Sequence, residues 1–402
     1  MMSPLSGKTK KYNLLILVSH PIQYQTPLYK LLSKEPDIDL TVLFCSDWGL
    51  KTYKDKGFGK EVKWDIPLLD GYKYKFLKNV SPFPNVSTFF GLINPEIVNE
   101  LKKSDYDAIW LHGWNSFTNW LAMVTAFYLN IPVLLRGETN LLQKPTFLKN
   151  LTKELVLKNL FKNISVFLAI GKYNADFYKS FGMPEEKIFL VPYTVNNDFF
   201  VSKAQELISK KKELRKKYNV PEESPVVLFS GKLIDKKRPF DLLKAFEIIS
   251  KDIRTSLVFV GDGNLRNKLE TYAKNNHIQN VFFIGFRNQT ELPEFYAMAD
   301  IFVLPSDFEP WGLVVNEAMC FGLPVIVSNK VGAGGDLVKN GENGFIYKAG
   351  NVIMLTSYLK DLLQDETKRI KFGQSSKGLI QEWSYKEDIS GILCAISSME
   401  SK

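Results

Sequence analysis

The sequence predicts an α/β protein built from two Rossmann-like domains. Strand-like apolar runs alternate with amphipathic helical segments along the whole chain, which is typical of a doubly wound parallel sheet with helices on both faces. The alternation occurs in two series, separated by the very basic stretch 203–219. A length of 402 residues is enough for two domains, each with its own core.

The first series predicts a domain over residues 1–188. Residues 46–94 within it are rich in Gly, Pro, Lys and aromatic side chains, and we expect long loops with short strands there. The predicted strands are 13–19, 38–45, 108–112, 132–136 and 166–170. The predicted helices between them include 27–35, 95–103 and 118–129.

The second series predicts a domain over residues 189–382. Two similar sheets in series indicate domains that face one another across a cleft, and ligands of such sheets lie beyond the carboxyl ends of the strands. The predicted strands are 226–230, 256–260, 281–284, 301–305 and 324–327. The predicted helices include 238–250, 263–275, 289–298 and 312–321.

Composition narrows the class of protein. Hydrophobic residues make up 45% and charged residues 24% of the chain, which is ordinary for a globular protein. No apolar run reaches the roughly 18–20 residues that span a bilayer, and the N-terminus lacks the apolar core of a signal peptide, so we expect a cytoplasmic protein. Three cysteines with apolar neighbours are predicted to be core residues rather than disulfides or metal ligands, namely Cys45, Cys320 and Cys394.

The formal net charge of +9 favours an anionic partner. The basic excess is larger in the N-terminal half, where residues 147–162 repeat lysine among leucines at helical spacing. This segment has two interpretations. It is either a surface helix whose apolar stripe packs on the core, or a basic helix that rests on anionic lipid headgroups at the inner face of a membrane.

Positive charge follows the first strand of the second series. Gly231 comes directly after that strand, and Lys232 and Lys237 lie in the turn and at the next helix start. Two cations together with backbone N–H groups can neutralise a diphosphate leaving group without a metal. The alternative is a solvated lysine cluster in a lysine-rich protein.

Glycines also follow the next two strands, as Gly261 and as Gly285 before Phe286. A glycine at a strand end allows either a tight turn or a close approach of the backbone to a flat ligand such as a nucleotide base. Because the glycines recur, we favour the second interpretation.

Two acids flank a predicted helix start near residue 312. Glu309 is predicted at the end of a buried strand and Glu317 about two turns into the next helix, with Gly312 between them. The free backbone N–H groups of a helix start attract an anion. An acid on each side suits a ligand that carries hydroxyls at both ends of a diphosphate, which describes a nucleotide sugar.

Taken together, these motifs resemble the C-terminal domain of glycosyltransferase family 4. In order they are Gly-Lys-x4-Lys, Gly-Asp-Gly, Val-Phe-Phe-Ile-Gly-Phe, Tyr-Ala-Met-Ala-Asp-Ile-Phe-Val-Leu-Pro-Ser and Glu-x7-Glu. The match continues to Phe345, so it covers nearly the whole second half. Members of this family are retaining nucleotide-sugar transferases with the two-domain GT-B fold. The resemblance implies that fold and that activity here.

The resemblance also implies a role for each motif residue. Glu317 would accept hydrogen bonds from the ribose hydroxyls, and Glu309 would hold sugar hydroxyls near the reacting carbon. Lys232 and Lys237 would bind the diphosphate. The family often has arginine at the position of Lys232, and lysine keeps the charge but loses the bidentate fork. Backbone N–H groups that help to bind the diphosphate would come from Gly312, Leu313 and Val314.

The N-terminal half resembles the family more loosely. His112, at the end of a predicted strand, would touch the donor sugar, and the alternative is a structural histidine. In the first loop Pro21 and Ile22 stand where many relatives have a Gly-rich turn. His20 and Gln23 would therefore contact acceptor or phosphate through their side chains.

Arg136 and Glu138 end another strand of the first domain. Arg136 could bind an anionic group of the acceptor and Glu138 an acceptor hydroxyl, but a buried Arg–Glu pair explains the two residues equally well. In relatives the last segment, here 383–402, crosses back onto the first domain, and we expect it to pack there.

We therefore predict a retaining hexosyltransferase that moves a sugar from a nucleoside-diphosphate sugar to a hydroxyl of a carbohydrate or lipid-linked acceptor. By resemblance the setting is the synthesis of surface polysaccharide, glycolipid or a related glycoconjugate. No metal or other cofactor is expected, because fixed cations would stabilise the leaving diphosphate. The predicted catalytic residues are His112, Glu309, Lys232 and Lys237.

Three other functions fit parts of the sequence. A metal-dependent transferase of A-type fold would use an Asp-x-Asp motif, but the two present, at 37–39 and 105–107, precede strands rather than follow them. A nucleotide-sugar 2-epimerase shares the fold and would consume the donor without an acceptor. A non-catalytic nucleic-acid-binding protein would fit the basic charge, but the lysines are dispersed and no nucleic-acid module is recognisable, so we expect no nucleic-acid partner.

Overall fold

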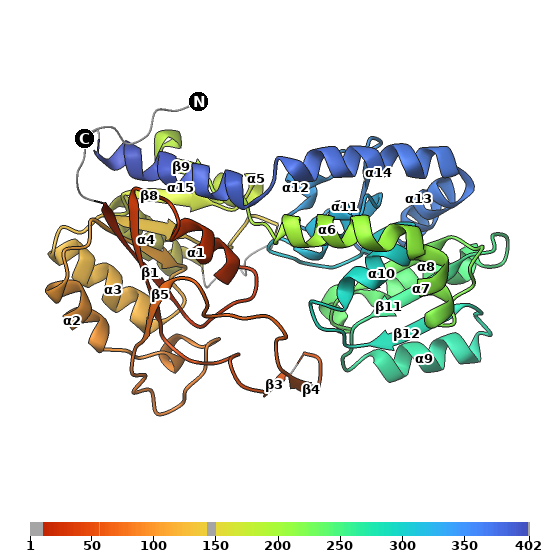
Figure 1. Ribbon diagram of the computed structural model, residues 1–402, viewed down its shortest axis with the longest axis horizontal. Helices are drawn as coiled ribbons and strands as arrows, with labels where there is room; N and C mark the ends of the chain where they lie inside the picture. Colours follow the sequence, from red (N-terminus) through yellow and green to blue (C-terminus); the bar gives the residue numbers. More distant parts are fainter. Residues whose placement is uncertain (1–10, 56, 143–149, 401–402) are drawn as a thin grey trace. The chain divides into compact units, whose positions relative to one another are not determined.

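The computed structural model describes residues 11–55, 57–142 and 150–400, and its contacts divide the chain into two units (Figure 1). Unit 1 consists of Met1–Tyr53, Ile66–Pro192 and Tyr385–Lys402, and unit 2 of Lys54–Asp65 and Tyr193–Ser384. The predicted first domain, 1–188, differs from unit 1 mainly in one segment. Residues 54–65 belong to unit 2, and side chains among them bind loops of that unit.

Unit 1 contains a seven-stranded parallel sheet with the order β5-β2-β1-β6-β7-β8-β9. Alternate residues of a strand face opposite sides of the sheet. In β1, Leu15 and Leu17 therefore join one hydrophobic cluster and Leu14 and Ile16 another. The strands are β1 (Tyr12–Val18), β2 (Ile38–Phe44), β5 (Lys73–Phe76), β6 (Ala108–His112), β7 (Val133–Arg136), β8 (Val166–Ala169) and β9 (Ile188–Leu190).

Helices cover both faces of this sheet. The buried side chains of α2, α3, α4 and α5 belong to one cluster, and those of α1 and the C-terminal helix α15 to the other. In α15 the buried stripe of Ile392, Ala395 and Ile396 has helical spacing. The helices are α1 (Thr26–Leu32), α2 (Glu96–Lys103), α3 (Phe117–Tyr128), α4 (Asn150–Lys162), α5 (Lys172–Ser180) and α15 (Tyr385–Glu400).

Unit 2 contains a six-stranded parallel sheet with the order β12-β11-β10-β13-β14-β15. A separate two-stranded sheet is formed by β3 (Tyr53–Asp55) and β4 (Lys60–Val62). The strands of the large sheet are β10 (Val226–Ser230), β11 (Ser256–Val260), β12 (Val281–Gly285), β13 (Ile301–Leu304), β14 (Val325–Ser328) and β15 (Gly344–Tyr347).

The sheet of unit 2 is also covered on both faces. Helices α8, α9 and α13 share a core cluster with alternate strand residues such as Val227 and Phe229, while α10 and α11 contact β10, β13 and β14. The helices are α6 (Asn197–Leu207), α7 (Lys211–Lys217), α8 (Pro239–Ile249), α9 (Arg266–Asn275), α10 (Leu292–Met298), α11 (Val314–Cys320), α12 (Gly334–Leu337), α13 (Val352–Gln364) and α14 (Glu366–Gln381).

Each sheet has one switch point, where successive connections leave in opposite directions. It lies between β1 and β6 in unit 1 and between β10 and β13 in unit 2. Ligands of doubly wound sheets bind beyond the carboxyl ends of the strands at this point. The predicted site residues that follow or end these four strands include His20, Gln23, His112, Lys232, Lys237 and Glu309.

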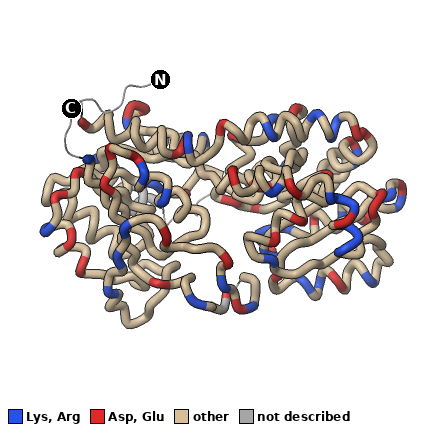
Figure 2. Tube along the Cα trace, in the orientation of Figure 1, with Lys and Arg blue, Asp and Glu red and all other residues tan. Residues whose placement is uncertain are grey.

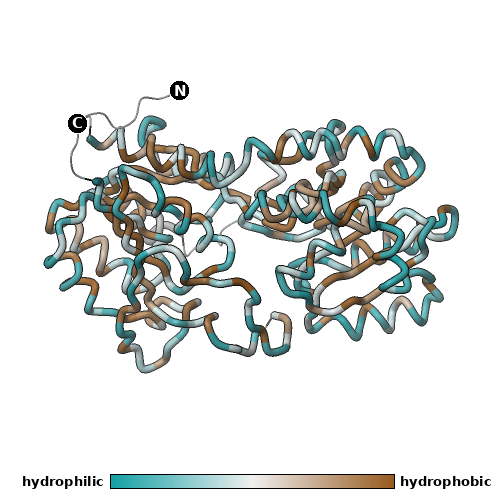
Figure 3. The backbone as a smooth tube through the Cα atoms, viewed as in Figure 1, coloured by the Kyte–Doolittle hydropathy of each residue, from teal (hydrophilic) through white to brown (hydrophobic). Residues whose placement is uncertain are grey.

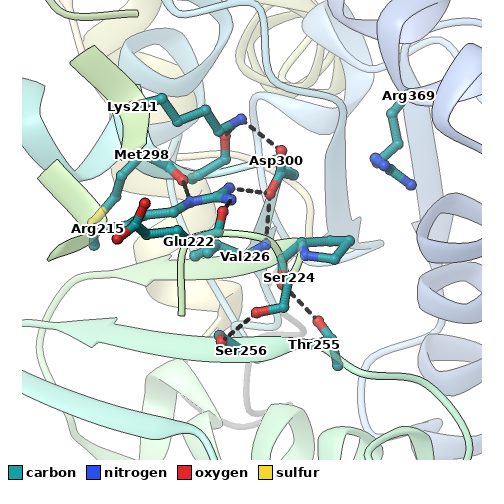
Figure 4. Close-up of polar contacts among 12 residues, drawn as sticks. Lys211, Arg215, Glu222, Ser224, Val226, Thr255, Ser256, Met298, Asp300 and Arg369 are labelled. Atoms are coloured by element: carbon teal, nitrogen blue, oxygen red, sulfur yellow. Dashed lines mark hydrogen bonds and ion pairs between the residues drawn. The ribbon is translucent and has the colours of Figure 1, made fainter. Parts of the chain in front are cut away.

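The opposite, amino-terminal edge of the unit 2 sheet is held by Asp300 (Figure 4). Its carboxylate accepts hydrogen bonds from Lys211 Nζ at 2.5 Å, from the Arg215 guanidinium at 2.6 Å and from the backbone N–H of Val226 at 2.6 Å. The Arg215 side chain is only 7% exposed and also donates to the carbonyl of Met298. This network fastens α7 to the first residue of β10.

Charged positions of both signs are mixed along both units (Figure 2). Hydrophobic residues alternate with hydrophilic ones along the helices (Figure 3), and the buried hydrophobic residues include most of those in the central strands. Among the described residues, no helix is long and apolar enough to cross a membrane. The same residues contain no group of three or more His, Cys, Asp or Glu side chains placed to hold a metal ion. Among the described residues the cysteines form no disulfide: Cys45 and Cys320 are buried and Cys394 is half-buried.

Candidate functional site

An ion pair spans the switch point of unit 2. Lys237, in the loop after β10, places its ammonium 2.7 Å from a carboxylate oxygen of Glu309, in the loop after β13. Both side chains are largely buried, at 17% and 9% exposed. The fold thus brings together two of the residues that the sequence predicts to be catalytic. A phosphate can replace the acid on Lys237, and sugar hydroxyls can replace the cation on Glu309.

The backbone of Glu309 is held by the loop after β14. Its N–H donates to the carbonyl of Lys330 at 2.9 Å, and its carbonyl accepts from the N–H of Gly332 at 3.1 Å. A Cβ on Gly332 would lie 2.0 Å from the carbonyl oxygen of Pro310, so only glycine fits there. The loop after β14 therefore fixes the backbone that carries the Glu309 side chain.

Lys232, the other predicted diphosphate cation, lies in the same loop as Lys237 but has a different partner. Its Nζ donates to both carboxylate oxygens of Asp55, at 2.9 and 3.0 Å, and lies 4.8 Å from the ring of Phe58. No sequence pattern marks Asp55 as a site residue, because residues 46–94 show no regular period. The available signal is an aspartate two residues before Gly57, which is typical of a tight turn.

The glycines of the three loops after β10, β11 and β12 hold those loops together. We call these the donor loops: 231–233, 261–263 and 285–286. A Cβ on Gly261 (φ 135°) would lie 1.9 Å from the carbonyl oxygen of Gly231, and one on Gly263 (φ 157°) 2.4 Å from that of Leu233. The N–H of Gly261 also donates to the carbonyl of Gly285 at 2.9 Å. Contact between neighbouring loops therefore requires glycine at positions 261 and 263. A close approach of this backbone to a nucleotide base stays a prediction.

Glu317 and Gly312 lie at the start of α11. The helix begins at Val314, so Glu317 is in its first turn rather than two turns in, and Glu309 is in a loop beyond β13 rather than at the strand end. Gly312 has φ 104°, which glycine adopts without strain. Glu317 is fully buried and accepts a hydrogen bond from the Tyr296 hydroxyl at 2.6 Å. Tyr296 fixes this carboxylate, and the ribose contact stays a prediction.

His112, at the end of β6, is held in a closed ring of hydrogen bonds within unit 1. The Tyr29 hydroxyl donates to Gln25 Oε1 at 2.9 Å, so its oxygen accepts from His112 Nε2 at 3.2 Å, and His112 Nδ1 accepts from Gln25 Nε2 at 3.3 Å. The imidazole also stacks on Trp110 with ring centres 4.9 Å apart. Both ring nitrogens therefore have partners. This arrangement favours the structural interpretation, and contact with the donor sugar stays a prediction.

Burial and the charge of Arg136 lower the pKa of His112 well below its usual value, and a pH-dependent stability follows. The unfolded chain binds a proton at His112 below about pH 6.5, whereas the folded chain does so only at much lower pH. The free energy of unfolding should therefore fall as the pH drops below about 6.5, by at most about 1.4 kcal/mol per pH unit. Denaturant titrations should show that the wild type loses stability relative to His112→Gln between about pH 7 and pH 5. Parallel pH profiles would contradict this account of His112.

His20 and Gln23 follow β1. Nδ1 of His20 lies 2.8 Å from the Ser19 hydroxyl, and its ring meets Trp48 edge-on at 4.8 Å. Burial lowers the pKa of His20 to about 4. Gln23 is buried, and its Oε1 accepts no hydrogen bond from a described residue. A buried acceptor without a partner is unusual, so Gln23 remains a candidate contact for a ligand.

Arg136, at the end of β7, pairs with Asp388 of α15. The two charged groups are 3.5 Å apart and almost fully buried, and Arg136 also donates to the carbonyls of Val191 and Pro192 at 3.4 Å. Burial raises the pKa of Asp388 to about 7, against the opposing charge of Arg136. Glu138 is exposed, so it does not form the buried Arg–Glu pair considered from the sequence. Arg136 fastens α15 to the sheet, and acceptor contacts of Arg136 and Glu138 stay predictions.

The Asp-x-Asp motifs lie at the amino-terminal edge of the unit 1 sheet. Asp107 accepts a hydrogen bond from the backbone N–H of Asn13 at 2.7 Å, and the Asn13 side chain donates to the carbonyl of Asp105 at 2.9 Å. Asp39 lies within β2. These residues connect strands at the edge opposite the carboxyl ends of the strands, which is consistent with a structural role.

The basic segment 147–162 is described only from Asn150, where α4 begins; residues 147–149 lie outside the described part of the chain. Leu155 and Val156 of α4 are exposed. The side chains that it packs on the core are Leu157, Leu160 and Phe161. An apolar stripe on the core agrees with the surface-helix interpretation, and lipid contact stays a prediction.

Two pockets of about 390 and 400 Å³ open on the surface of unit 2. Their linings include residues that precede strands, such as Thr255 before β11 and Pro324 before β14. Both pockets therefore lie at the amino-terminal edge of the sheet, away from the donor loops, and neither carries the predicted chemistry.

Residues 210–378 match the family model of glycosyl transferases, group 1. The matched part contains the predicted donor residues from Gly231 to Glu317. The chain is 29% identical over 178 residues to N-acetyl-alpha-D-glucosaminyl L-malate synthase of Bacillus anthracis, covering 44% of this chain and 46% of that protein. It is 35% identical over 164 residues to spore coat protein SA of Bacillus subtilis, covering 38% and 43%. The chain thus spans less than half the length of these two relatives.

The structure is similar to that of Anabaena Alr3699/HepE in complex with UDP, with a TM-score of 0.73 and 19% identity over 98% of this chain and 100% of that chain. At this identity the similarity shows the fold alone, which is the GT-B fold of glycosyltransferases. The prediction of an α/β protein with two Rossmann-like domains of the GT-B class is confirmed.

Proposed function

We propose that the chain transfers a sugar from a nucleoside diphosphate to an acceptor hydroxyl with retention of configuration at the anomeric carbon. The observation that carries the proposal is the Lys237–Glu309 pair at the switch point of a glycosyltransferase domain. Lys232 supplies a second cation from the same loop. The UDP bound by the structural relative supports a nucleoside diphosphate as the leaving group.

In the proposed reaction, the bond between the anomeric carbon and the diphosphate oxygen breaks. A bond to the acceptor oxygen forms on the same face, and the acceptor proton passes to an oxygen of the leaving diphosphate. Lys232 and Lys237 stabilise the charge that develops on the diphosphate, because cations already in place need no reorganisation. Glu309, released from Lys237 by the incoming phosphate, accepts hydrogen bonds from sugar hydroxyls and orients the reacting carbon.

Glu317 and the start of α11 complete the proposed donor site. Because Tyr296 fixes the Glu317 carboxylate, this acid can select a ribose whose two hydroxyls reach it. The base would lie near Gly285 and Phe286 of the donor loops. The acceptor is proposed to be a carbohydrate or a lipid-linked molecule.

A product assay tests the proposed function. The donor base is first chosen by a thermal-shift screen with UDP, GDP and ADP, since a ligand that binds the folded state raises the unfolding temperature. The matching nucleotide sugars are then incubated with candidate acceptors, and NMR reads the anomeric configuration of the product. Transfer with retained configuration supports the proposal. Conversion of the donor to its 2-epimer without any acceptor would instead identify an epimerase.

Activity is expected to be unchanged in excess EDTA. The described residues offer two lysines for the diphosphate and no cluster of acids for a metal. Fixed cations can stabilise the leaving group without a divalent ion. Initial rates are compared with and without EDTA after dialysis, and again after added Mg²⁺ or Mn²⁺. A rate that disappears with EDTA and returns with metal would contradict the assigned roles of the two lysines.

A further inference from the structure

A hairpin from the first half of the chain lies on the donor loops of unit 2. It consists of residues 54–65, which belong to unit 2 and contain β4 and most of β3, and residue 56 lies outside the described part of the chain. Asp55 closes its turn, because Oδ1 accepts from the backbone N–H groups of Gly57 at 2.7 Å and Phe58 at 2.9 Å. The carboxylate of Asp55 is therefore held in one orientation by the hairpin itself.

Two ion pairs bind the hairpin to the first two donor loops. Asp55 binds Lys232 of the loop after β10 through both oxygens. The ammonium of Lys60 lies 2.6 Å from the carboxylate of Asp262, in the loop after β11. A Cβ on Gly57 would lie 2.6 Å from the Lys232 side chain, so the turn touches this lysine along its length.

The third donor loop also contacts the hairpin. The ring of Phe58 meets that of Phe286 edge-on, with centres 4.8 Å apart. Beyond β4, Asp65 accepts hydrogen bonds from the backbone N–H and the hydroxyl of Thr290, shortly after the same loop. The hairpin thus covers the loops at the carboxyl ends of β10, β11 and β12 together.

The carboxylate of Asp55 binds Lys232, the same cation that binds the diphosphate in the proposed function. Burial raises the pKa of Asp55, but the hydrogen bond from Lys232 and those from Phe58 and Gly57 outweigh it, and the net shift is downward. The side chain is therefore a carboxylate at neutral pH. A carboxylate with two oxygens on one ammonium occupies the position that phosphate oxygens take on a lysine.

We propose that hairpin 54–65 is an autoinhibitory cap on the donor site, in which Asp55 occupies Lys232 until a diphosphate displaces it. The inference rests on the proposed function, since the diphosphate of the donor is the competing ligand. The apparent affinity for the donor is then the affinity of the open form multiplied by the fraction of molecules in which the cap is open. Weakening the cap at any of its contacts raises that affinity.

The test is calorimetric titration of the full chain with UDP, GDP and ADP in turn. Asp55→Asn keeps the shape of the side chain and removes its charge, and it should bind the preferred nucleotide about threefold to tenfold more tightly than the wild type. Lys60→Gln loosens the hairpin without touching Lys232 and should shift affinity in the same direction. Asp252→Asn is the matched control, because it removes one negative charge from an exposed side chain that pairs with Lys360 and lines the pocket at the amino-terminal edge. Its affinity should equal that of the wild type.

Hydrogen exchange gives a second readout that does not depend on affinity. The nucleotide should increase the exchange of amides in residues 57–65 of the wild type, since the cap opens when phosphate takes Lys232. If the wild type binds a nucleotide but Asp55→Asn binds it equally or more weakly, the proposed autoinhibition is contradicted, whereas the proposed transferase function is not. Binding by Asp55→Asn alone would support both proposals. No binding by either protein would overturn both.

Discussion

Replacing Lys237 with alanine is expected to lower kcat by about 100-fold to 1000-fold. The variant loses a fixed cation that faces the leaving diphosphate, and it also removes the partner of Glu309. The missing charge matters most in the transition state, where negative charge on the diphosphate is greatest. Initial rates at saturating donor and acceptor measure the effect.

The neighbouring lysine provides the control. Lys236 is exposed, and its ammonium lies 5.0 Å from the ring of Phe308, so Lys236→Ala removes the same charge without touching the proposed donor site. This variant should retain the wild-type kcat. Circular dichroism at the assay temperature shows whether Lys237→Ala remains folded. A folded Lys237→Ala protein with near wild-type kcat would contradict the proposed mechanism.

Replacing Asp300 with alanine is expected to destabilise unit 2 by about 3 kcal/mol or more. The change leaves the Arg215 guanidinium, which is largely buried, without its carboxylate and removes the acceptor of the Val226 N–H. A buried charge without a counter-ion is costly because it has lost its water. Chemical denaturation of the wild type and the variant measures the difference.

The matched control for Asp300 is an exposed ion pair in the same region. Glu223 binds Lys212 at 2.7 Å, and both side chains are mostly exposed, at 70% and 66%. Glu223→Ala should cost less than about 1 kcal/mol, because water replaces the lost partner. Equal losses for the two variants would show that Asp300 has no special role in fastening α7.

The central strands were predictable from the sequence because both their faces are buried. β6, β10 and β11 are continuous apolar runs, and their predicted bounds agree with the structure. β5, β9 and β15 are the outer strands at three sheet ends and were not predicted individually. β5 and β9 are largely exposed or half-buried, so their sequences lack the apolar run that marks a central strand.

The sequence predicts that Glu309 and Glu317 flank a helix start, but it does not predict their exact positions on the strand, loop and helix. β13 ends at Leu304, and the chain then follows an irregular path to Val314, where α11 begins. This path is set by backbone hydrogen bonds between Glu309 and the loop that contains Lys330 and Gly332. Such contacts between loops leave no periodic pattern in the sequence.

The partners of the charged site residues could not be predicted either. Lys237 and Glu309 were each expected to bind the donor, but their pairing depends on the strand order, which places β10 beside β13. Lys232 and Asp55 are far apart in the sequence and meet only because the hairpin packs on the donor loops. Non-local contacts of this kind arise from side-chain complementarity in the folded chain.

A crystal structure of the full chain with the best-binding nucleoside diphosphate tests the central claim most directly. We expect diphosphate oxygens within about 3 Å of the ammonium groups of Lys237 and Lys232. We also expect Asp55 to have left Lys232. A diphosphate bound elsewhere, with Lys237 still on Glu309 and Lys232 still on Asp55, would contradict the account.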